Sequence, residues 1–131
     1  MSLYIGIDLG TSAMKLLLMD EEGQIKNVVS KEYPLEFPQP GWSQQAPEDW
    51  RKALMEGVPE LLEGFDGADV AGIGCGGQMH GLVILDAADN VIRPAILWND
   101  GRNIIFPFLN SGTNFCSCIF NLCILIVKHI I

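Results

Sequence analysis

The segment from Leu3 to Met19 constrains the fold more than any other part of the sequence. An apolar run ends at Asp8, a glycine turn with two hydroxyl side chains follows, and an alternating apolar run begins at Lys15. This order predicts a strand–turn–strand hairpin with a polar tip. Gly10 lets the backbone approach an anion closely, because glycine lacks a Cβ atom. The tip suits a phosphate, and a plain hairpin turn that uses glycine and hydroxyl residues explains the pattern equally well.

The side chains at this tip are those that a metal-bound phosphate needs. Thr11 and Ser12 offer hydroxyl donors, and Lys15 offers a positive charge. Successive backbone N–H groups in such a turn form an anion-binding concavity. Asp8 suits a hydrated Mg²⁺, which prefers one or two carboxylates together with phosphate oxygens.

Length and charge narrow the class of protein. The 131 residues, 49% of them apolar, are enough for one domain with a modest core. The net charge of −8 argues against a nucleic acid or an anionic membrane as the partner. The sequence opens on a predicted strand that contains Asp8 rather than on a secretory signal, so we expect a cytoplasmic protein.

The composition changes abruptly after Arg102. All 16 acidic residues lie at or before Asp100, and three of the four cysteines lie after Arg102. We therefore expect a domain over residues 1–102 and an unrelated apolar tail over residues 103–131, produced by a frameshift or by intron read-through. The apolar run 116–127 is shorter than the roughly 20 residues that cross a membrane. Three cysteines without a nearby fourth ligand are a weak zinc signal.

Apolar periodicity predicts an α/β fold with a mixed sheet. The expected strands cover residues 3–8, 15–20, 24–32, 70–75 and 82–85, with 24–32 buried on one side and 70–75 buried. A short return follows at 91–92, and the last apolar run covers 96–98. A proline-rich loop over residues 33–47 holds Trp42, which we expect to anchor the loop to the core rather than to form a lid. A helix should start at Pro47, bend or restart at Pro59 and end at Gly64.

Two further stretches carry polar side chains suited to a sugar. Residues 76–81 place Gln78 and His80 at a strand end, where ligands bind in open α/β sheets. Both side chains donate and accept hydrogen bonds, as a polyol or keto sugar requires, and a purely structural histidine is the competing interpretation. Trp98 offers a flat apolar face for a sugar ring.

The second of these stretches, residues 94–102, also carries a carboxylate and a guanidinium group. Asp100 and Arg102 lie two residues apart, so on an extended chain they share a side. We expect them to form a structural ion pair.

Three motifs in this order resemble one family. Residues 6–12 (GIDLGTS) resemble the first phosphate loop of the sugar-kinase, heat-shock-protein-70 and actin superfamily. Residues 76–81 (GGQMHG) and 95–102 (AILWNDGR) resemble the FGGY carbohydrate kinases, and most of all their xylulokinase branch. Chaperone and actin ATPases lack the last two motifs, and a glycerol kinase-like member would carry Arg-Glu in place of Met79-His80. The resemblance covers residues 3–102 and implies a ribonuclease H-like, actin-like ATPase fold, with only the first part of the N-terminal lobe present.

The resemblance implies an ATP-dependent phosphotransferase that converts D-xylulose to D-xylulose 5-phosphate with ATP and Mg²⁺. It implies ATP and phosphate binding by Asp8, Gly10, Thr11, Ser12, Ala13 and Lys15, with Asp8 holding Mg²⁺ through water. It implies sugar binding by Gln78, Met79, His80 and Trp98. A homodimer is implied for the full-length family.

In this family the catalytic base is an aspartate further along the sequence, in a part that this chain does not contain. The base would take the proton from the sugar hydroxyl as its oxygen attacks the γ-phosphate. We therefore expect the 131-residue chain alone to be inactive. The alternatives are a non-catalytic remnant, a kinase for another ketose or polyol, and a regulatory or membrane-tethered fragment.

Overall fold

The computed structural model of the chain describes residues 1–104. The expected tail at 103–131 lies, apart from its first two residues, outside the described residues. The described residues form two units, each described by itself below: residues 1–33 with 50–77, and residues 34–49 with 78–104.

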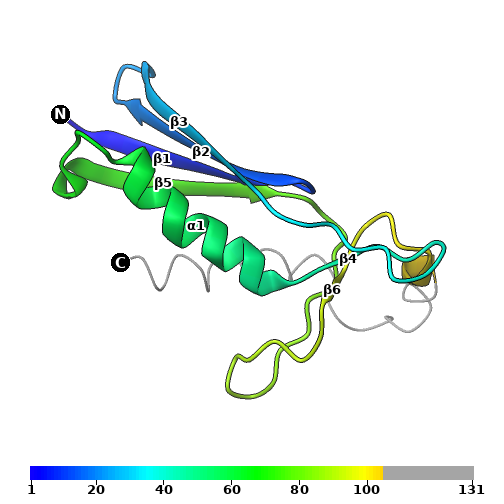
Figure 1. The fold of residues 1–131 in the computed structure, drawn as a ribbon. Coiled ribbons are helices and arrows are strands. Elements are labelled where there is room, and N and C mark those ends of the chain that lie inside the picture. The colour runs from blue at the N-terminus through cyan, green and yellow to red at the C-terminus, as the bar shows by residue number, and fades with distance from the viewer. Residues whose placement is uncertain (105–131) are drawn as a thin grey trace. The chain divides into compact units, whose positions relative to one another are not determined.

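A four-stranded sheet forms the first unit, in the order β3-β2-β1-β5 (Figure 1). Its strands are β1 (Leu3–Leu9), β2 (Ala13–Asp20), β3 (Ile25–Glu32) and β5 (Val70–Gly77). β1, β2 and β3 are antiparallel neighbours, and β5 lies parallel to β1. A parallel neighbour needs a long crossover connection, and here that connection contains a helix. The prediction of an α/β fold with a mixed sheet is confirmed.

The helix α1 (Pro47–Leu61) lies along one face of this sheet (Figure 1). Every second residue of β1 and β2 is buried, and with the buried side chains of α1 these residues make the core of this unit. The largest fully buried side chains include Trp50, Leu54 and Leu61 of α1 and Leu3, Leu9, Met14, Leu16 and Leu18 of the strands. Asn27 of β3 donates a hydrogen bond to the Leu61 carbonyl at 2.9 Å and so satisfies one of the orphan acceptors at the helix end.

The helix does not restart at Pro59, although a restart was one of the two outcomes predicted from the sequence. α1 continues through Pro59 to Leu61. A proline there removes one N–H, whose partner would be the Met55 carbonyl one turn earlier. Met55 is exposed, so water can satisfy that carbonyl, and only two residues of α1 follow Pro59. Gly64 adopts a φ of +83° just beyond α1, which is the conformation that glycine favours after a helix.

Charged side chains order the turn between β2 and β3. The Asp20 carboxylate accepts hydrogen bonds from the backbone N–H groups of Glu22 (3.0 Å) and Gln24 (2.8 Å) and pairs with Lys26 at 2.6 Å. These partners, the Lys26 hydrogen bond first, lower the pKa of Asp20. Val29 is buried while Lys26, Val28 and Ser30 are exposed, so the prediction that β3 buries one side is confirmed.

Two strand predictions are wrong in detail. β5 forms, but none of its residues is buried. It is the edge strand of the described sheet, and glycines at four of its eight positions leave it little side chain to bury. Residues 82–85 do not form a strand: Leu82 and Leu85 make isolated bridges to Ile96 and Val91. A bridge at each end is enough to align this segment without continuous pairing.

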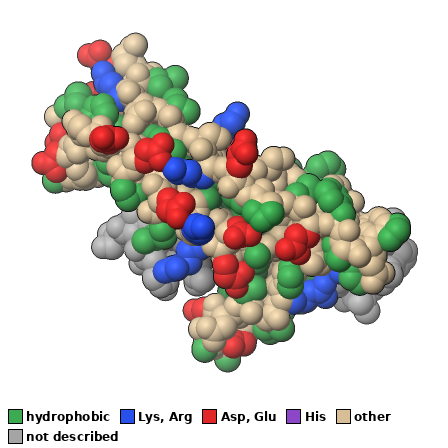
Figure 2. Space-filling view, in the orientation of Figure 1, with side chains coloured by type: hydrophobic (Ala, Val, Ile, Leu, Met, Phe, Trp, Pro, Cys, Tyr) green, Lys and Arg blue, Asp and Glu red, His purple; other side chains and the backbone are tan. Residues whose placement is uncertain are grey.

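The second unit is built from short pairings. β4 (Gln44–Gln45) and β6 (Ala95–Ile96) form an antiparallel pair, and a 3₁₀ turn, η2, covers Gly101–Ile104. A similar turn of the first unit, η1, covers Gly67–Asp69 just before β5. The Arg102 guanidinium carbon lies 3.7 Å from the centre of the Trp42 ring, so Trp42 contacts the segment that carries Arg102. On the face drawn in Figure 2, Lys and Arg side chains are interspersed with Asp and Glu.

Candidate functional site

The turn between β1 and β2 is closed tightly at Gly10. The Gly10 N–H donates to the Ala13 carbonyl at 3.0 Å. A Cβ atom at position 10 would lie 2.7 Å from that same carbonyl oxygen, so only glycine fits. Asp8, Gly10, Thr11, Ser12, Ala13 and Lys15, the residues predicted to bind phosphate, all gather at this end of the hairpin.

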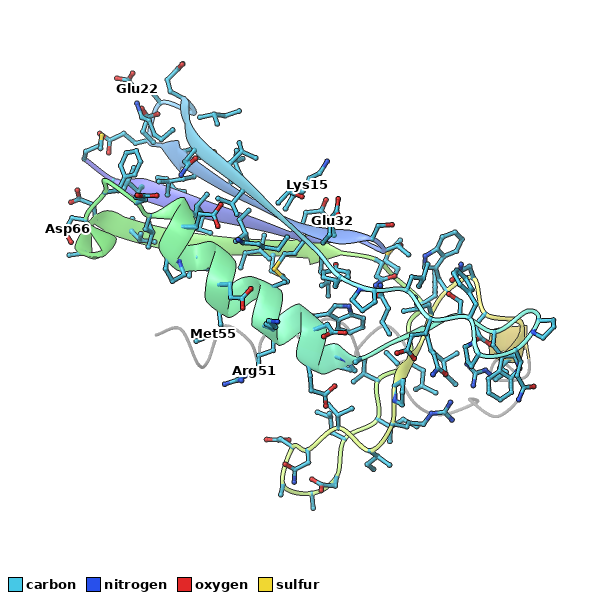
Figure 3. All side chains as sticks on the ribbon, in the orientation of Figure 1. Lys15, Glu22, Glu32, Arg51, Met55 and Asp66 are labelled. Carbon is cyan, nitrogen blue, oxygen red and sulfur yellow. The ribbon has the colours of Figure 1, made fainter. Side chains whose placement is uncertain are left out.

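A row of polar positions crosses the sheet beside the tip. Asp8 is the register partner of Lys15 on one side and of Gly76 on the other, and Lys15 is the partner of Ser30. All four residues are exposed. Figure 3 shows Lys15 extending from the sheet on the side away from α1. The row therefore places a carboxylate, an ammonium group and a hydroxyl on one open face.

Glycines keep the space beside Asp8 open. A Cβ atom added at Gly74 or Gly76 would meet nothing within 4 Å. One residue further on, a Cβ atom at Gly77 would lie 2.8 Å from the Leu9 Cβ atom and 2.9 Å from the Leu9 carbonyl oxygen. β5 thus packs closely against the end of β1 and leaves room next to the Asp8 carboxylate.

A metal ion beside Asp8 would need a bound phosphate to complete its coordination. Within residues 1–104, no three His, Cys, Asp or Glu side chains gather into a group that could bind a metal. Mg²⁺ does not require such a group, because it keeps most of its waters and binds one or two carboxylates and substrate phosphates. Asp8, exposed beside Lys15 and an open space, fits that mode of binding.

Tyr33, which the sequence analysis treated only as the start of a loop, contacts the tip directly. Its hydroxyl donates to the Gly10 carbonyl at 2.5 Å, and its backbone N–H donates to the Ser12 carbonyl at 3.2 Å. Burial, and to a smaller extent the charge of Asp8, raise the pKa of the Tyr33 phenol above its usual value. The phenol therefore stays protonated and remains a donor.

The second unit holds the residues predicted to contact a sugar. Met79, His80 and Trp98 are exposed, and Gln78 is half-buried. The antiparallel bridge between Leu82 and Ile96 lies two residues from both His80 and Trp98, so both lie at the same end of that pairing. His80 has a φ of 59°, which is uncommon for a residue other than glycine and tends to occur at functional positions.

Gln78 also has a partner inside the protein. Its amide nitrogen donates to the Gln45 side-chain oxygen at 3.2 Å, and the Gln45 amide nitrogen donates to the Pro34 carbonyl at 3.3 Å. Gln45 is 1% exposed. The buried Gln45 therefore orients Gln78, a link that no sequence pattern indicated.

Asp100 and Arg102 form the predicted ion pair. The guanidinium donates through Nη2 at 2.5 Å and Nε at 2.9 Å to the two carboxylate oxygens. The backbone N–H groups of Ser43 (2.6 Å) and Arg102 (2.7 Å) donate to the same carboxylate. These donors, the Arg102 side chain first, lower the pKa of Asp100 to about 2. The pair holds the loop of Trp42 to the segment that carries Trp98.

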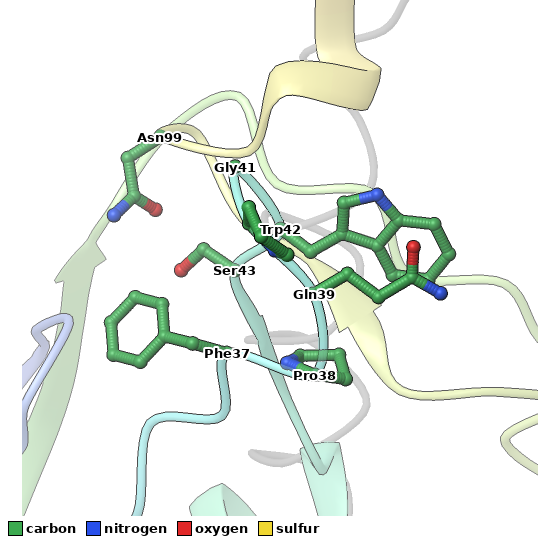
Figure 4. A pocket seen from close by; sticks show the side chains of 8 residues that line it. Phe37, Pro38, Gln39, Gly41, Trp42, Ser43 and Asn99 are labelled. Atoms are coloured by element: carbon green, nitrogen blue, oxygen red, sulfur yellow. The ribbon is translucent and has the colours of Figure 1, made fainter.

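A hollow of about 500 Å³ lies beside this pair within the second unit (Figure 4). Its lining residues are Phe37, Pro38, Gln39, Pro40, Gly41, Trp42, Ser43 and Asn99. The Ser43 hydroxyl is buried and has no hydrogen-bond partner among the described residues. None of the residues predicted to bind sugar lines this hollow.

The geometry agrees with what comparison with known proteins shows. Residues 3–106 match the FGGY family of carbohydrate kinases, N-terminal domain. The chain belongs to this family. The predicted family, and with it the actin-like ATPase fold of its sugar kinases, is confirmed.

The FGGY chain is similar to proteins named xylulose kinase. It is 45% identical over 100 residues to that of Escherichia coli (strain K12) and 47% identical over 104 residues to that of Bacillus subtilis (strain 168). These matches cover 76% and 78% of this chain but 21% of each relative, so the chain spans about a fifth of their length.

The chain is also similar to solved structures of sugar kinases. A "xyloylose kinase" from Brucella ovis matches 76% of this chain and 22% of its own, with 44% identity and a TM-score of 0.73. A gluconate kinase from Lactobacillus acidophilus matches 85% of this chain and 23% of its own, with 33% identity and a TM-score of 0.74. No helix within residues 1–104 of this FGGY chain is long and apolar enough to cross a membrane.

Proposed function

We propose that this chain supplies the first phosphate loop and a sugar-binding loop of an ATP-dependent kinase that converts D-xylulose to D-xylulose 5-phosphate in the cytoplasm. The observation that carries the proposal is the row Lys15, Asp8 and Gly76 on the open face beside the hairpin tip. It combines a cation, a carboxylate and free space, which is what a Mg²⁺-bound phosphate needs.

Each residue of the phosphate loop has a proposed role. Asp8 holds Mg²⁺ through water, and Lys15 binds phosphate oxygens as a point charge. Gly10, Thr11, Ser12 and Ala13 bring backbone N–H groups and hydroxyls to the same anion. When bound, Mg²⁺ would neutralise charge on the phosphates of ATP. The residues of the chain then orient the phosphates.

The sugar loop is the basis for the proposed substrate. Gln78 and His80 would hydrogen-bond the hydroxyls, and Met79 and Trp98 would cover the apolar face of the sugar. The relatives named xylulose kinase support D-xylulose. The gluconate kinase match supports, as the second candidate, another linear polyhydroxy substrate.

The catalytic base and the adenosine pocket are proposed to come from sequence outside this chain. We therefore expect no ADP release from the 131-residue chain with D-xylulose and Mg-ATP. We further propose that the family domain covers residues 1–102 and that the chain beyond the family match, from residue 107 onward, is not part of it. A homodimer of the full-length protein is part of the same proposal.

A chimera tests the proposal directly. Residues 1–102 would replace the matching segment of the Escherichia coli xylulose kinase, and ADP release would be measured with D-xylulose, gluconate and glycerol. We expect turnover with D-xylulose, and a fall in kcat of about 100-fold or more when Asp8 is changed to Ala. The control is Asp89→Asn, on an exposed loop of the second unit. A folded chimera whose turnover is insensitive to Asp8→Ala would contradict the proposed site.

A further inference from the structure

Tyr33 is hydrogen-bonded to the hairpin tip at two separate points. Its hydroxyl donates to the Gly10 carbonyl, and its N–H donates to the Ser12 carbonyl. Tyr33 is 8% exposed and directly follows β3. Tyr33 thus holds the carbonyl groups on both sides of Thr11.

This arrangement changes how the turn closes. When two residues flank a two-residue hairpin turn as a hydrogen-bonded pair, each donates to the other. The Gly10 N–H donates to the Ala13 carbonyl, but across residues 1–104 no return hydrogen bond runs from the Ala13 N–H to the Gly10 carbonyl. The Gly10 carbonyl accepts from Tyr33 instead. The Ala13 N–H is therefore not used to close the turn.

The planar peptide bond between Gly10 and Thr11 fixes the direction of the Thr11 N–H group. In a trans peptide the C=O and N–H groups point to opposite sides, and the chain has no cis peptide among the described residues. Because the Gly10 carbonyl points toward the Tyr33 hydroxyl, the Thr11 N–H points in the opposite direction. The tip thus directs backbone donors away from Tyr33.

We propose that Tyr33 is a positioning residue for the phosphate site, holding the Gly10 carbonyl so that the Ala13 N–H stays available to a phosphate oxygen. This inference rests on the proposed function of the tip. The raised pKa of the phenol supports it, because a protonated hydroxyl keeps its hydrogen bond across the physiological range. Tyr33 itself does not touch the phosphate.

The experiment uses the complete 131-residue chain, labelled with ¹⁵N, and compares Tyr33→Phe with wild type. The matched control is Tyr4→Phe, since Tyr4 is the other tyrosine and lies on an exposed position of β1 away from the tip. Inorganic pyrophosphate with Mg²⁺ is the probe. Amide shifts give the Kd and show which N–H groups respond, and hydrogen exchange reports the protection of the Ala13 amide.

We expect Mg-pyrophosphate to shift the Ala13 amide in wild type and in Tyr4→Phe. Tyr33→Phe should weaken binding by about tenfold, because one charge-assisted hydrogen bond is lost. Exchange at Ala13 should become slower in Tyr33→Phe, because its N–H can now close onto the freed Gly10 carbonyl. A tyrosine that only stabilised the fold would produce the reverse, faster exchange at the tip.

Several results would overturn the inference. Equal Kd values for Tyr33→Phe and wild type would overturn the role of Tyr33 and leave the phosphate site standing. Wild type that binds no Mg-pyrophosphate would overturn the proposed site, and this inference with it. If circular dichroism shows that Tyr33→Phe does not fold, the amide shifts of the wild-type chain with Mg-pyrophosphate test the inference instead. An Ala13 amide that does not move while pyrophosphate binds would then overturn the inference.

Discussion

Asp8 and Lys15 are register partners across the β1–β2 hairpin, so a carboxylate and an ammonium group leave the same exposed face at the same level of the sheet. Gly76 continues that level on the other side of Asp8. The pairing brings together opposite charges and an open space. Such a set can bind a metal ion and the anion that accompanies it.

Asp8→Asn should separate metal binding from phosphate binding. In the wild-type chain, Mg²⁺ should strengthen pyrophosphate binding, because Asp8 and the phosphates share the ion. In Asp8→Asn that benefit should fall by about tenfold. Metal-free binding should improve slightly, because a negative charge beside the phosphate is gone. Calorimetric titration with and without Mg²⁺ measures both, and Asp89→Asn is the control. An unchanged response to Mg²⁺ would place the metal elsewhere.

The imidazole of His80 should matter for the sugar and not for the nucleotide. In the chimera, His80→Ala should raise KM for D-xylulose by about tenfold, which corresponds to one lost hydrogen bond. KM for ATP should change less than twofold. His80→Gly removes the same ring but accepts the φ of 59° without strain. An equal rise in KM for D-xylulose in both variants would show that the ring matters. Full activity in His80→Gly would show that the backbone conformation matters instead. Equal losses for sugar and ATP would contradict the assignment.

Two glycines of β5 should respond oppositely to alanine. Gly77→Ala places a Cβ atom 2.8 Å from the Leu9 Cβ atom, and such overpacking typically costs about 1–3 kcal/mol of the free energy of unfolding. Gly74→Ala meets nothing within 4 Å and should be neutral or stabilising by about 0.5 kcal/mol. Urea unfolding at neutral pH compares the two. A Gly77→Ala chain as stable as Gly74→Ala would contradict the close packing of β5 on β1.

The Asp100–Arg102 pair should make stability depend on pH in the acid range. The pKa of Asp100 is about 2 in the folded chain against an ordinary 3.8, so folding favours the ionised carboxylate. Its contribution is complete above 3.8 and is lost as the pH falls toward 2. Asp100→Asn should lower the free energy of unfolding by about 2–3 kcal/mol at pH 7.

At acid pH, Asp100→Asn and wild type should have similar free energies of unfolding. The gap between wild type and Asp100→Asn should narrow as the pH falls from 4 to 2, since wild type then also loses the charge. Guanidinium unfolding curves along this pH series measure the gap. A gap that stays constant down to pH 2 would show that the charge of Asp100 contributes nothing.

Local patterns in the sequence were enough for the features whose parts are close together in the chain. The polar hairpin tip, the start of α1 at Pro47 and the Asp100–Arg102 pair follow from residues a few positions apart. Turn chemistry, proline at a helix start and alternation along a strand act over such distances. The family motifs were also readable, because each is a short contiguous run.

Relations across strands could not be read in the same way. Ser30 beside Lys15, Gly76 beside Asp8 and the Tyr33 hydroxyl on Gly10 all depend on the register between strands. Local signals also misjudged a helix restart at Pro59 and the strand at residues 82–85, because tertiary packing overrides propensity and a few bridges can replace a strand.

The sequence by itself therefore determined which chemical groups this chain carries and that they occupy a turn and two loops. Only the tertiary structure decided which of them share one face and which carbonyl the buried tyrosine holds. The physical reason is that strand register is set by the summed packing of the whole sheet against α1. A shift of one residue would turn Asp8 and Lys15 toward the core and bury their charges.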